Sequence, residues 1–259
     1  FDIACNFTHE SFNDDLNKVI DDGLANGVNR FLVVAAELDD AEKINKLILQ
    51  HDDFFCFTTG VHPHHAKSFN SDSSDRMREL IKKYSPNALG EMGLDFFRNL
   101  SSHDEQVFAF AEQIKLAIEF NKPLFLHQRD AHESFIKVLN TYKADIDKAV
   151  VHCFTGTQLE LDDYIECDFY IGLTGWICDE RRNKDLRASI KNIPLNRLML
   201  ETDSPYLIPR NLKPKPKSNR NEPKNLMHIA SEIAGLRSES IEEICNATYQ
   251  NSLDFFNQV

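Results

Sequence analysis

The sequence has 259 residues, of which 42% are hydrophobic and 27% charged, with nine glycines and nine prolines. This ordinary composition excludes fibrous and low-complexity chains, and the length is sufficient for a core without disulfides or a structural metal. The formal net charge of −12 argues against a sequence-reading DNA-binding groove or attachment to anionic lipid. The same charge is compatible with a nuclease that neutralises phosphate with metal ions. We therefore expect one domain over residues 1–259.

Six cysteines occur without a CxxC pair or the spacing of a secreted disulfide framework. No uncharged run approaches the ~18–20 residues of a membrane span, and the first fifteen residues lack the basic and apolar regions of a signal peptide. These features predict a cytoplasmic protein with reduced thiols and no membrane contact. No feature indicates an obligate protein partner, so we expect a monomer.

Eight short apolar runs are separated by longer amphipathic stretches. Such runs are typical of strands covered on both faces, and their alternation with helical patterns indicates parallel βαβ connections. The pattern predicts an α/β protein of the TIM-type (β/α)8 barrel class. The runs cover residues 1–7, 30–36, 54–62, 88–95, 123–130, 149–154, 169–175 and 198–205.

Several segments between these runs carry helix signals. Residues 104–120 place five apolar side chains on one face, and capping boxes of the form Ser/Thr-x-x-Glu begin at Ser102 and Thr157. Asp130 is the predicted N-cap of the helix after the fifth strand. Residues 224–236 and 240–256 also read as helices, and the second is expected to cover the barrel as an extra C-terminal helix.

Residues 205–223 contain five of the nine prolines, which predicts a stiff loop and excludes a helix. Between Tyr206 and Asn221 this segment has no acidic residue and five basic ones. A solvated surface loop would explain this composition. We favour a loop that faces an anion, because loops after the last strand of a barrel often form phosphate sites. The basic residues are Arg210, Lys213, Lys215, Lys217 and Arg220.

Five polar residues lie near the carboxyl ends of predicted strands, where the active sites of barrels are found. A lone histidine in an apolar strand is usually a hydrogen-bonded core residue, but buried carboxylates such as Glu91 and Asp203 are costly without a partner. A cation would supply that partner. Two histidines and two carboxylates form a ligand set suited to Zn, Mn or Mg. The predicted ligands are Glu91, His127, His152 and Asp203, and the fifth residue is His62.

Neighbouring residues leave some alternatives open. His62 is favoured as the functional histidine because it ends its strand, whereas His64 and His65 lie beyond Pro63 and could be surface residues. Arg129 is either a salt-bridge partner at the helix entry or a phosphate clamp. A nucleophilic pair of Cys153 with the preceding histidine is not expected, because adjacent strand residues point to opposite faces.

An ordered series of segments resembles the TatD family of metal-dependent DNases within the amidohydrolase-like barrels. The resemblance spans nearly the whole chain. It rests on the order of all the segments together, because no single tetrapeptide is specific enough. The segments are GVHPH (60–64), GEMGLD (90–95), LHQRDAHE (126–133), HCFTGT (152–157), YIGLTGW (170–176), ETDSPYL (201–207) and RNEP (220–223).

The resemblance implies a role for each matching residue. Glu91 would anchor the metal, and Asp203 would bind metal and help to activate water. His62 would be a catalytic or phosphate-contacting residue, and Glu201 would support Asp203. The remaining implied positions are the metal ligands His127 and His152, and Arg129 and Arg220 on the phosphate side.

One departure concerns the first strand, where most of the family carries a His-x-His metal pair. Ala4 and Asn6 occupy these positions, which is similar to the TatD subgroup proper. We therefore expect one firm divalent-metal site and a second that is weak or missing, with Mg the ion in use and Mn or Zn as alternatives. Asn6 could hydrogen-bond either a water on the metal or an oxygen of the substrate phosphate.

The family resemblance implies a metal-dependent deoxyribonuclease, specifically a 3′-5′ exonuclease that prefers the ends of single-stranded DNA or RNA and serves DNA repair or turnover. His62, Glu91 and Asp203 are its expected catalytic residues. Two alternatives stay open. The same site could hydrolyse another bond, such as a D-aminoacyl-tRNA ester, or the chain could be a non-catalytic nucleic-acid-binding barrel.

Overall fold

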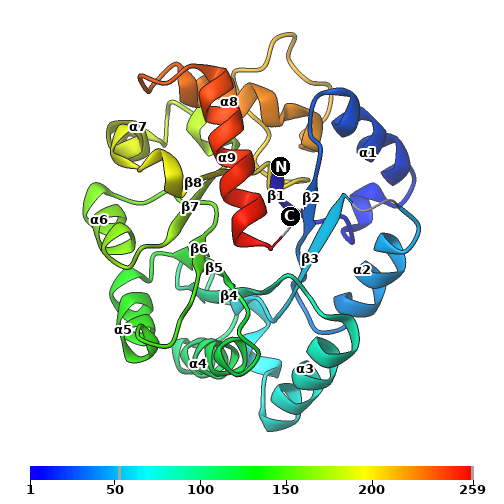
Figure 1. Cartoon of the computed structure of the whole chain (residues 1–259), viewed down its shortest axis with the longest axis vertical. Helices are drawn as coiled ribbons and strands as arrows, with labels where there is room; N and C mark the ends of the chain where they lie inside the picture. The colour runs from blue at the N-terminus through cyan, green and yellow to red at the C-terminus, as the bar shows by residue number, and fades with distance from the viewer. Residues whose placement is uncertain (52–53, 258–259) are drawn as a thin grey trace. The chain divides into compact units, whose positions relative to one another are not determined.

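The computed structural model describes residues 1–51 and 54–257, in which strands and helices alternate along the chain (Figure 1). Each of the eight apolar runs contains a strand. The strands are β1 (Asp2–Cys5), β2 (Phe31–Val33), β3 (Phe55–Thr59), β4 (Ala88–Asp95), β5 (Leu124–Arg129), β6 (Ala149–Val151), β7 (Tyr170–Leu173) and β8 (Leu198–Leu200).

The α-helices follow the same alternation, with two of them after the last strand. None in the described part of the chain is long and apolar enough to cross a membrane. The helices are α1 (Leu16–Ala25), α2 (Asp40–Ile48), α3 (Ser71–Tyr84), α4 (His103–Glu119), α5 (His132–Tyr142), α6 (Gln158–Glu166), α7 (Lys184–Ser189), α8 (Leu226–Ala234) and α9 (Ile241–Phe255).

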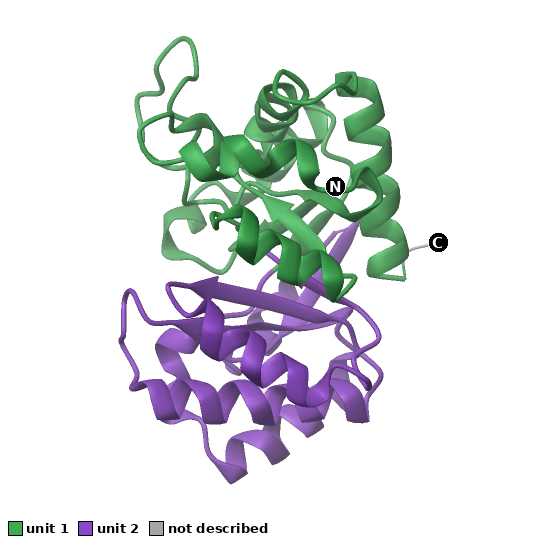
Figure 2. Ribbon diagram, turned by 90° about the vertical axis from the view of Figure 1, so that its left-hand side faces the viewer, with its two compact units in different colours: residues 1–33, 153–259 green, residues 34–152 purple. Residues whose placement is uncertain are grey.

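The chain divides into two units, which Figure 2 colours separately. Unit 1 comprises residues 1–33 and 153–259, and unit 2 comprises residues 34–152. Each unit contains four strands, and the strand pairs described within each are parallel. The expectation of one domain over the whole chain stays a prediction.

Unit 2 contains β3, β4, β5 and β6, which pair in chain order. All eight residues of β4 are buried, as expected of a central strand covered on both faces. The helices contribute their apolar faces to the core, and the rings of Phe110 in α4 and Phe135 in α5 stack with centroids 5.1 Å apart. In the register of β4 and β5, Gly93 lies opposite His127 and Asp95 opposite Arg129.

Two glycines let β4 approach β5 closely. Gly90 and Gly93 have φ values of 149° and 145°, which side chains disfavour. A Cβ atom at Gly90 would lie 2.3 Å from the carbonyl oxygen of Phe125, and one at Gly93 would lie 1.9 Å from that of His127. The close approach therefore requires glycine at both positions, one on each side of Met92 and Glu91.

Unit 1 pairs β1 with β2 and β7 with β8, and a parallel bridge between Cys5 and Ser204 joins the two pairs. Asp2 in β1 accepts hydrogen bonds from the backbone and hydroxyl of Thr202, at 2.8 and 2.6 Å. At the other end of the chain, the Asn251 amide in α9 donates to the backbone carbonyls of Leu195 and of Leu198, the first residue of β8. This helix is the predicted C-terminal one, and it begins with a capping box at Ser240.

The local helix predictions have mixed outcomes. The capping boxes at Ser102 and Thr157 are confirmed, because each side chain accepts from the N3 backbone while the N3 glutamate accepts in return. The N-cap prediction for Asp130 is wrong. Helix α5 follows Ala131 without a side-chain cap, while Asp130 has a left-handed backbone (φ 51°), a conformation that aspartate tolerates in turns. Residues 205–222 form no α-helix, as predicted.

Candidate active site

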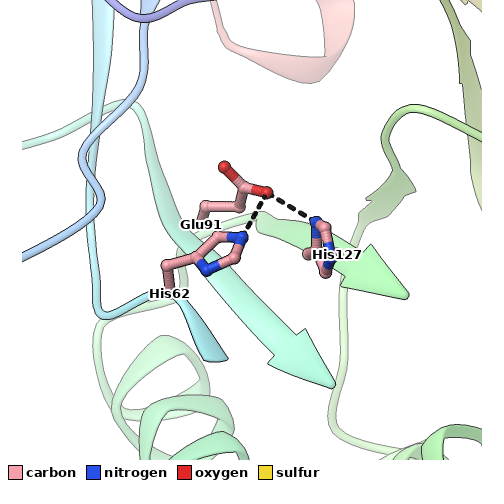
Figure 3. A group of neighbouring side chains, drawn as sticks. All are labelled: His62, Glu91 and His127. Carbon is pink, nitrogen blue, oxygen red and sulfur yellow. Dashed lines mark hydrogen bonds and ion pairs between the residues drawn. The ribbon is translucent and has the colours of Figure 1, made fainter. Parts of the chain in front are cut away.

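Four side chains of unit 2 converge near the carboxyl ends of consecutive strands. His62 follows β3 and caps a short 3₁₀ helix, Glu91 lies in β4, His127 lies in β5, and His152 directly follows β6. Figure 3 shows His62 and His127 directed at the carboxylate of Glu91. The topology of parallel strands therefore assembles residues that are up to ninety positions apart in the sequence.

One carboxylate oxygen is the centre of this group. Glu91 Oε1 lies 2.6 Å from His152 Nε2, 2.8 Å from His127 Nδ1 and 3.3 Å from His62 Nε2. Glu91 is only 7% exposed. Three imidazoles thus surround a carboxylate that is almost entirely removed from water.

These neighbours keep Glu91 ionised. Burial alone would raise the pKa of Glu91, but its electrostatic interactions with the neighbouring His152 and His62 and the hydrogen bonds from His127 and His152 hold that pKa well below its ordinary value. The group therefore presents a buried anion next to imidazole nitrogens. This is the electrostatic environment that a divalent cation requires.

His62 plays a different part from the other two histidines. Its Nδ1 accepts a hydrogen bond from the backbone N–H of His64 at 3.1 Å, and burial lowers the pKa of His62 to about 4. The neutral ring carries a single proton, which the accepting Nδ1 places on Nε2, facing Glu91. In this structure His62 is therefore a hydrogen-bond donor to Glu91.

Asp95 belongs to this group and was not predicted from the sequence. Its Oδ2 lies 2.8 Å from His64 Nε2 and 3.4 Å from His127 Nε2. Burial opposes its ionisation, but hydrogen bonds from His127, His64 and the Arg98 backbone hold the pKa of Asp95 below its ordinary value. The signal was available, because Asp95 is a carboxylate at the end of an apolar strand, as Asp203 is.

The arrangement fits a divalent cation. The ligand atoms of His62, Glu91 and His127 lie within 4.8 Å of one another, and His152 Nε2 reaches the same oxygen of Glu91. His127 directs Nδ1 at Glu91 and its other nitrogen at Asp95, and such an outer carboxylate is what orients histidine ligands in metal sites. Glu91 and the three histidines around it are therefore the residues of this group that could hold a metal.

Two further predicted residues meet within unit 1. Asp203 follows β8 and Asn6 follows β1, and the Asn6 amide donates to Asp203 Oδ1 at 3.0 Å and to the Ser204 carbonyl at 3.1 Å. Glu201, two residues before Asp203, accepts the backbone N–H of Cys153. The bridge between Cys5 and Ser204 thus brings the neighbouring side chains of Asn6 and Asp203 into contact.

The predicted phosphate-side residues have different environments. The Arg220 guanidinium binds Asp15 at 2.7 and 2.8 Å and Glu222 at 2.8 Å, and these partners raise its pKa. Arg220 is thus engaged in a bidentate ion pair that anchors the end of the proline-rich loop. Arg129 instead lies over the ring of Phe97, with Cζ 4.0 Å from the centroid.

The proline-rich loop exposes its basic residues. Lys213, Lys215 and Lys217 are exposed, as is Arg210, whose Nε lies 3.9 Å from Asp179 Oδ2. The three lysines project into solvent from a non-helical segment. Their role toward an anion stays a prediction.

Comparison with known proteins gives concordant matches over the whole chain. The family model described as TatD related DNase matches residues 1–257. Two curated proteins named 3'-5' ssDNA/RNA exonuclease TatD are each 43% identical to this chain. The protein from Pantoea ananatis aligns over 99% of this chain and 98% of its own length, and that from Yersinia pseudotuberculosis serotype O:3 over 100% of both.

Solved structures agree with these matches. A TatD homologue from Escherichia coli K12 has a TM-score of 0.90 at 25% identity, covering 100% of this chain and 98% of its own. A TatD family hydrolase from Entamoeba histolytica has a TM-score of 0.86 at 26% identity, covering 98% and 96%. The predicted (β/α)8 barrel class is confirmed. From the family match and the level of identity, this chain belongs to the TatD family of DNases.

Proposed function

We propose that this protein is a metal-dependent 3′-5′ exonuclease of single-stranded DNA or RNA. Membership of the TatD family supports a hydrolase of phosphodiester bonds, and the names of the curated relatives support the direction and the substrate. The observation that carries the proposal is the convergence of His127 Nδ1 and His152 Nε2 on one oxygen of Glu91. This geometry gives a buried anion and two nitrogen ligands at one point.

The proposed metal ligands are Glu91, His127 and His152, with Asp203 as the further ligand expected from the sequence. When bound, a divalent cation at such a site lowers the pKa of a water molecule and polarises the phosphate. Mg is our prediction for the ion in use, and the two imidazoles make Mn and Zn its competitors. A second ion would be held weakly, because Ala4 and Asn6 offer no imidazole on the first strand.

The side chains of the protein supply the remaining chemistry. His62 would donate a hydrogen bond from Nε2 to a phosphate oxygen or to the leaving oxygen, because its Nδ1 is occupied by the His64 backbone. Asp203 would accept a proton from the attacking water. Asn6 holds one oxygen of that carboxylate, so it would fix the orientation of Asp203.

The alternative functions have less support. Hydrolysis of a D-aminoacyl-tRNA ester would need the same metal group, but the curated relatives carry the exonuclease name. A non-catalytic binding barrel would have no need to bury the Glu91 carboxylate among three histidines. A monomeric state, a cytoplasmic location and a role in DNA repair are predictions from the sequence and the family resemblance.

The decisive test uses one single-stranded oligonucleotide labelled at either the 3′ or the 5′ end, incubated with Mg, Mn or Zn. We expect immediate release of a labelled mononucleotide from the 3′ label and progressive shortening of the 5′-labelled strand. A chelator should stop both. Absence of cleavage with every metal, or turnover of aminoacyl esters with the oligonucleotide left intact, would overturn the proposal.

A further inference from the structure

An exposed turn directly follows the strand that carries Glu91. All four residues 97–100 are exposed, and Phe97 and Leu100 are 57% and 56% exposed. The preceding Phe96 stacks on His103 at the start of α4, with centroids 3.6 Å apart. Of two adjacent phenylalanines, one is therefore packed against the protein and the other is presented to solvent.

Phe97 has a cation against its ring. The Arg129 guanidinium lies 4.0 Å from the ring centroid, and the Phe96 N–H donates to the Arg129 carbonyl at 3.0 Å, which ties the turn to the end of β5. Within residues 1–51 and 54–257, no carboxylate oxygen lies within ion-pair distance of Arg129. Arg129 therefore keeps its charge available beside the ring, while the uncovered area of Phe97 lies away from the guanidinium.

The turn is also connected to the histidine group. Asp95 Oδ1 accepts the backbone N–H of Arg98 at 2.7 Å, while its Oδ2 faces His64 and His127. Asn99 adopts a left-handed backbone (φ 50°) and donates to the Asp95 carbonyl at 3.3 Å. A single buried carboxylate thus fixes both the turn that presents Phe97 and a histidine beside Glu91.

We propose that Phe97 and Arg129 form a stacking platform that binds a nucleobase of the substrate next to the cleaved phosphate. The proposal rests on the proposed nuclease function. A single-stranded end has unstacked bases, and an aromatic ring binds any of them because every base has a π-face. The guanidinium polarises the ring and neutralises the adjacent phosphate, so the platform binds without reading sequence.

An exposed apolar side chain alone is common on protein surfaces and carries no such meaning. Phe108 in α4 provides the comparison. It is 48% exposed, but its ring neighbour is Phe69, at 6.4 Å between centroids. Phe97 differs because it combines exposure, a guanidinium on one face and a backbone fixed by Asp95. Phe108→Leu is therefore the matched control for Phe97→Leu, since each removes one exposed ring.

The binding test uses a single-stranded oligonucleotide with 2-aminopurine at its 3′-terminal nucleotide, in chelator so that no turnover occurs. Stacking quenches the fluorescence of 2-aminopurine. We expect quenching by the wild-type protein, by Phe97→Tyr and by Phe108→Leu, and loss of quenching with Phe97→Leu. Equal quenching by Phe97→Leu and the wild type would overturn the platform.

The kinetic test compares the same variants with Mg on intact oligonucleotides and on ones that lack the 3′-terminal base. Stacking of one base should make KM rise about tenfold in Phe97→Leu with kcat nearly unchanged. Removing the 3′-terminal base should raise the KM of the wild type by the same factor and leave the KM of Phe97→Leu unchanged.

If the wild type cleaves and Phe97→Leu matches it on both substrates, the platform fails while the nuclease function stands. If the wild type quenches 2-aminopurine but cleaves no oligonucleotide, the function fails while the platform stands.

Discussion

Each unit contains a fully or almost fully buried carboxylate in a strand, and the two behave oppositely. Glu91 in unit 2 is 7% exposed and Asp2 in unit 1 is 0% exposed. Imidazoles surround Glu91, and its pKa lies well below the ordinary value. Asp2 contacts the hydroxyl and backbone N–H of Thr202 and the N–H of Ala4, and burial raises its pKa to about 6.

The comparison distinguishes the effect of burial on the pKa of a carboxyl group from the effect of the side chains that contact it. Burial favours the neutral form of both carboxyl groups, and neutral donors at Asp2 reduce this effect without reversing it. Only neighbours that can carry positive charge keep Glu91 ionised. Burial therefore does not by itself set the ionisation of these two carboxylates: the imidazoles around Glu91 keep it anionic, whereas the hydroxyl and amide donors around Asp2 leave its pKa raised.

Glu91→Gln should have the largest effect. The amide is isosteric but removes the anion, and losing a ligand of the proposed ion costs several kcal/mol of transition-state stabilisation, a fall in kcat/KM of about 1,000-fold or more. The measurement is kcat/KM on a single-stranded oligonucleotide, with divalent-metal binding by calorimetry. Asp2→Asn, which also neutralises a buried carboxylate, is the control and should keep its activity. Comparable losses in the two variants would contradict the distinction between the two carboxylates.

The stability of the protein should depend on pH through Asp2. The folded-state pKa of about 6 lies above the ordinary value of 3.8, so the folded protein binds this proton more tightly than the unfolded chain. The stabilisation from this proton is complete below about pH 4 and is lost as the pH rises through 6. The total loss is up to about 3 kcal/mol in the free energy of unfolding. Urea denaturation between pH 4 and 8 measures it. Asp2→Asn should remove this component, and an identical pH dependence in the variant would contradict it.

Asp95→Asn should have a smaller effect, on metal affinity. An amide can keep the turn bond to the Arg98 N–H, but it no longer offers a carboxylate to His127 Nε2. Loss of such an outer carboxylate typically lowers metal affinity about 10–100-fold. Competition with a fluorescent chelator measures the affinity. His64→Phe removes the other imidazole from Asp95 and should change the metal affinity much less. An equal loss of metal affinity in His64→Phe would contradict the role assigned to the contact between Asp95 and His127.

Four of the strand-end residues expected from the sequence meet within unit 2, and the reason is topological. Consecutive parallel strands bring their carboxyl ends to one edge, so His62, Glu91, His127 and His152 could be grouped once the strands were placed. What the sequence could not predict is which atoms meet. The nitrogen of each histidine that faces Glu91 depends on ring orientation, and the donor role of His62 depends on the backbone N–H of His64.

Two aspartates, Asp130 and Asp95, depart from the sequence-based expectations for a common reason. The position of Asp130 before a helix predicts an N-cap, but its left-handed backbone places it in the turn before α5. The position of Asp95 at the end of an apolar strand marks it as a candidate, but its partners His64 and His127 come from two other segments of the chain, so its role follows only from the three-dimensional structure. Both depend on backbone dihedrals and three-dimensional neighbours, whereas the capping boxes at Ser102 and Thr157 depend on four adjacent residues and were predicted correctly.

The glycines on either side of Glu91 and Met92 limit how this protein could be redesigned. Gly90 and Gly93 contribute no functional group, yet a methyl group at either position would collide with the backbone of β5. Any library that diversifies the residues near the metal group while leaving these two fixed keeps the spacing between Glu91 and His127. A library that varies them would discard that spacing before any new chemistry could be selected.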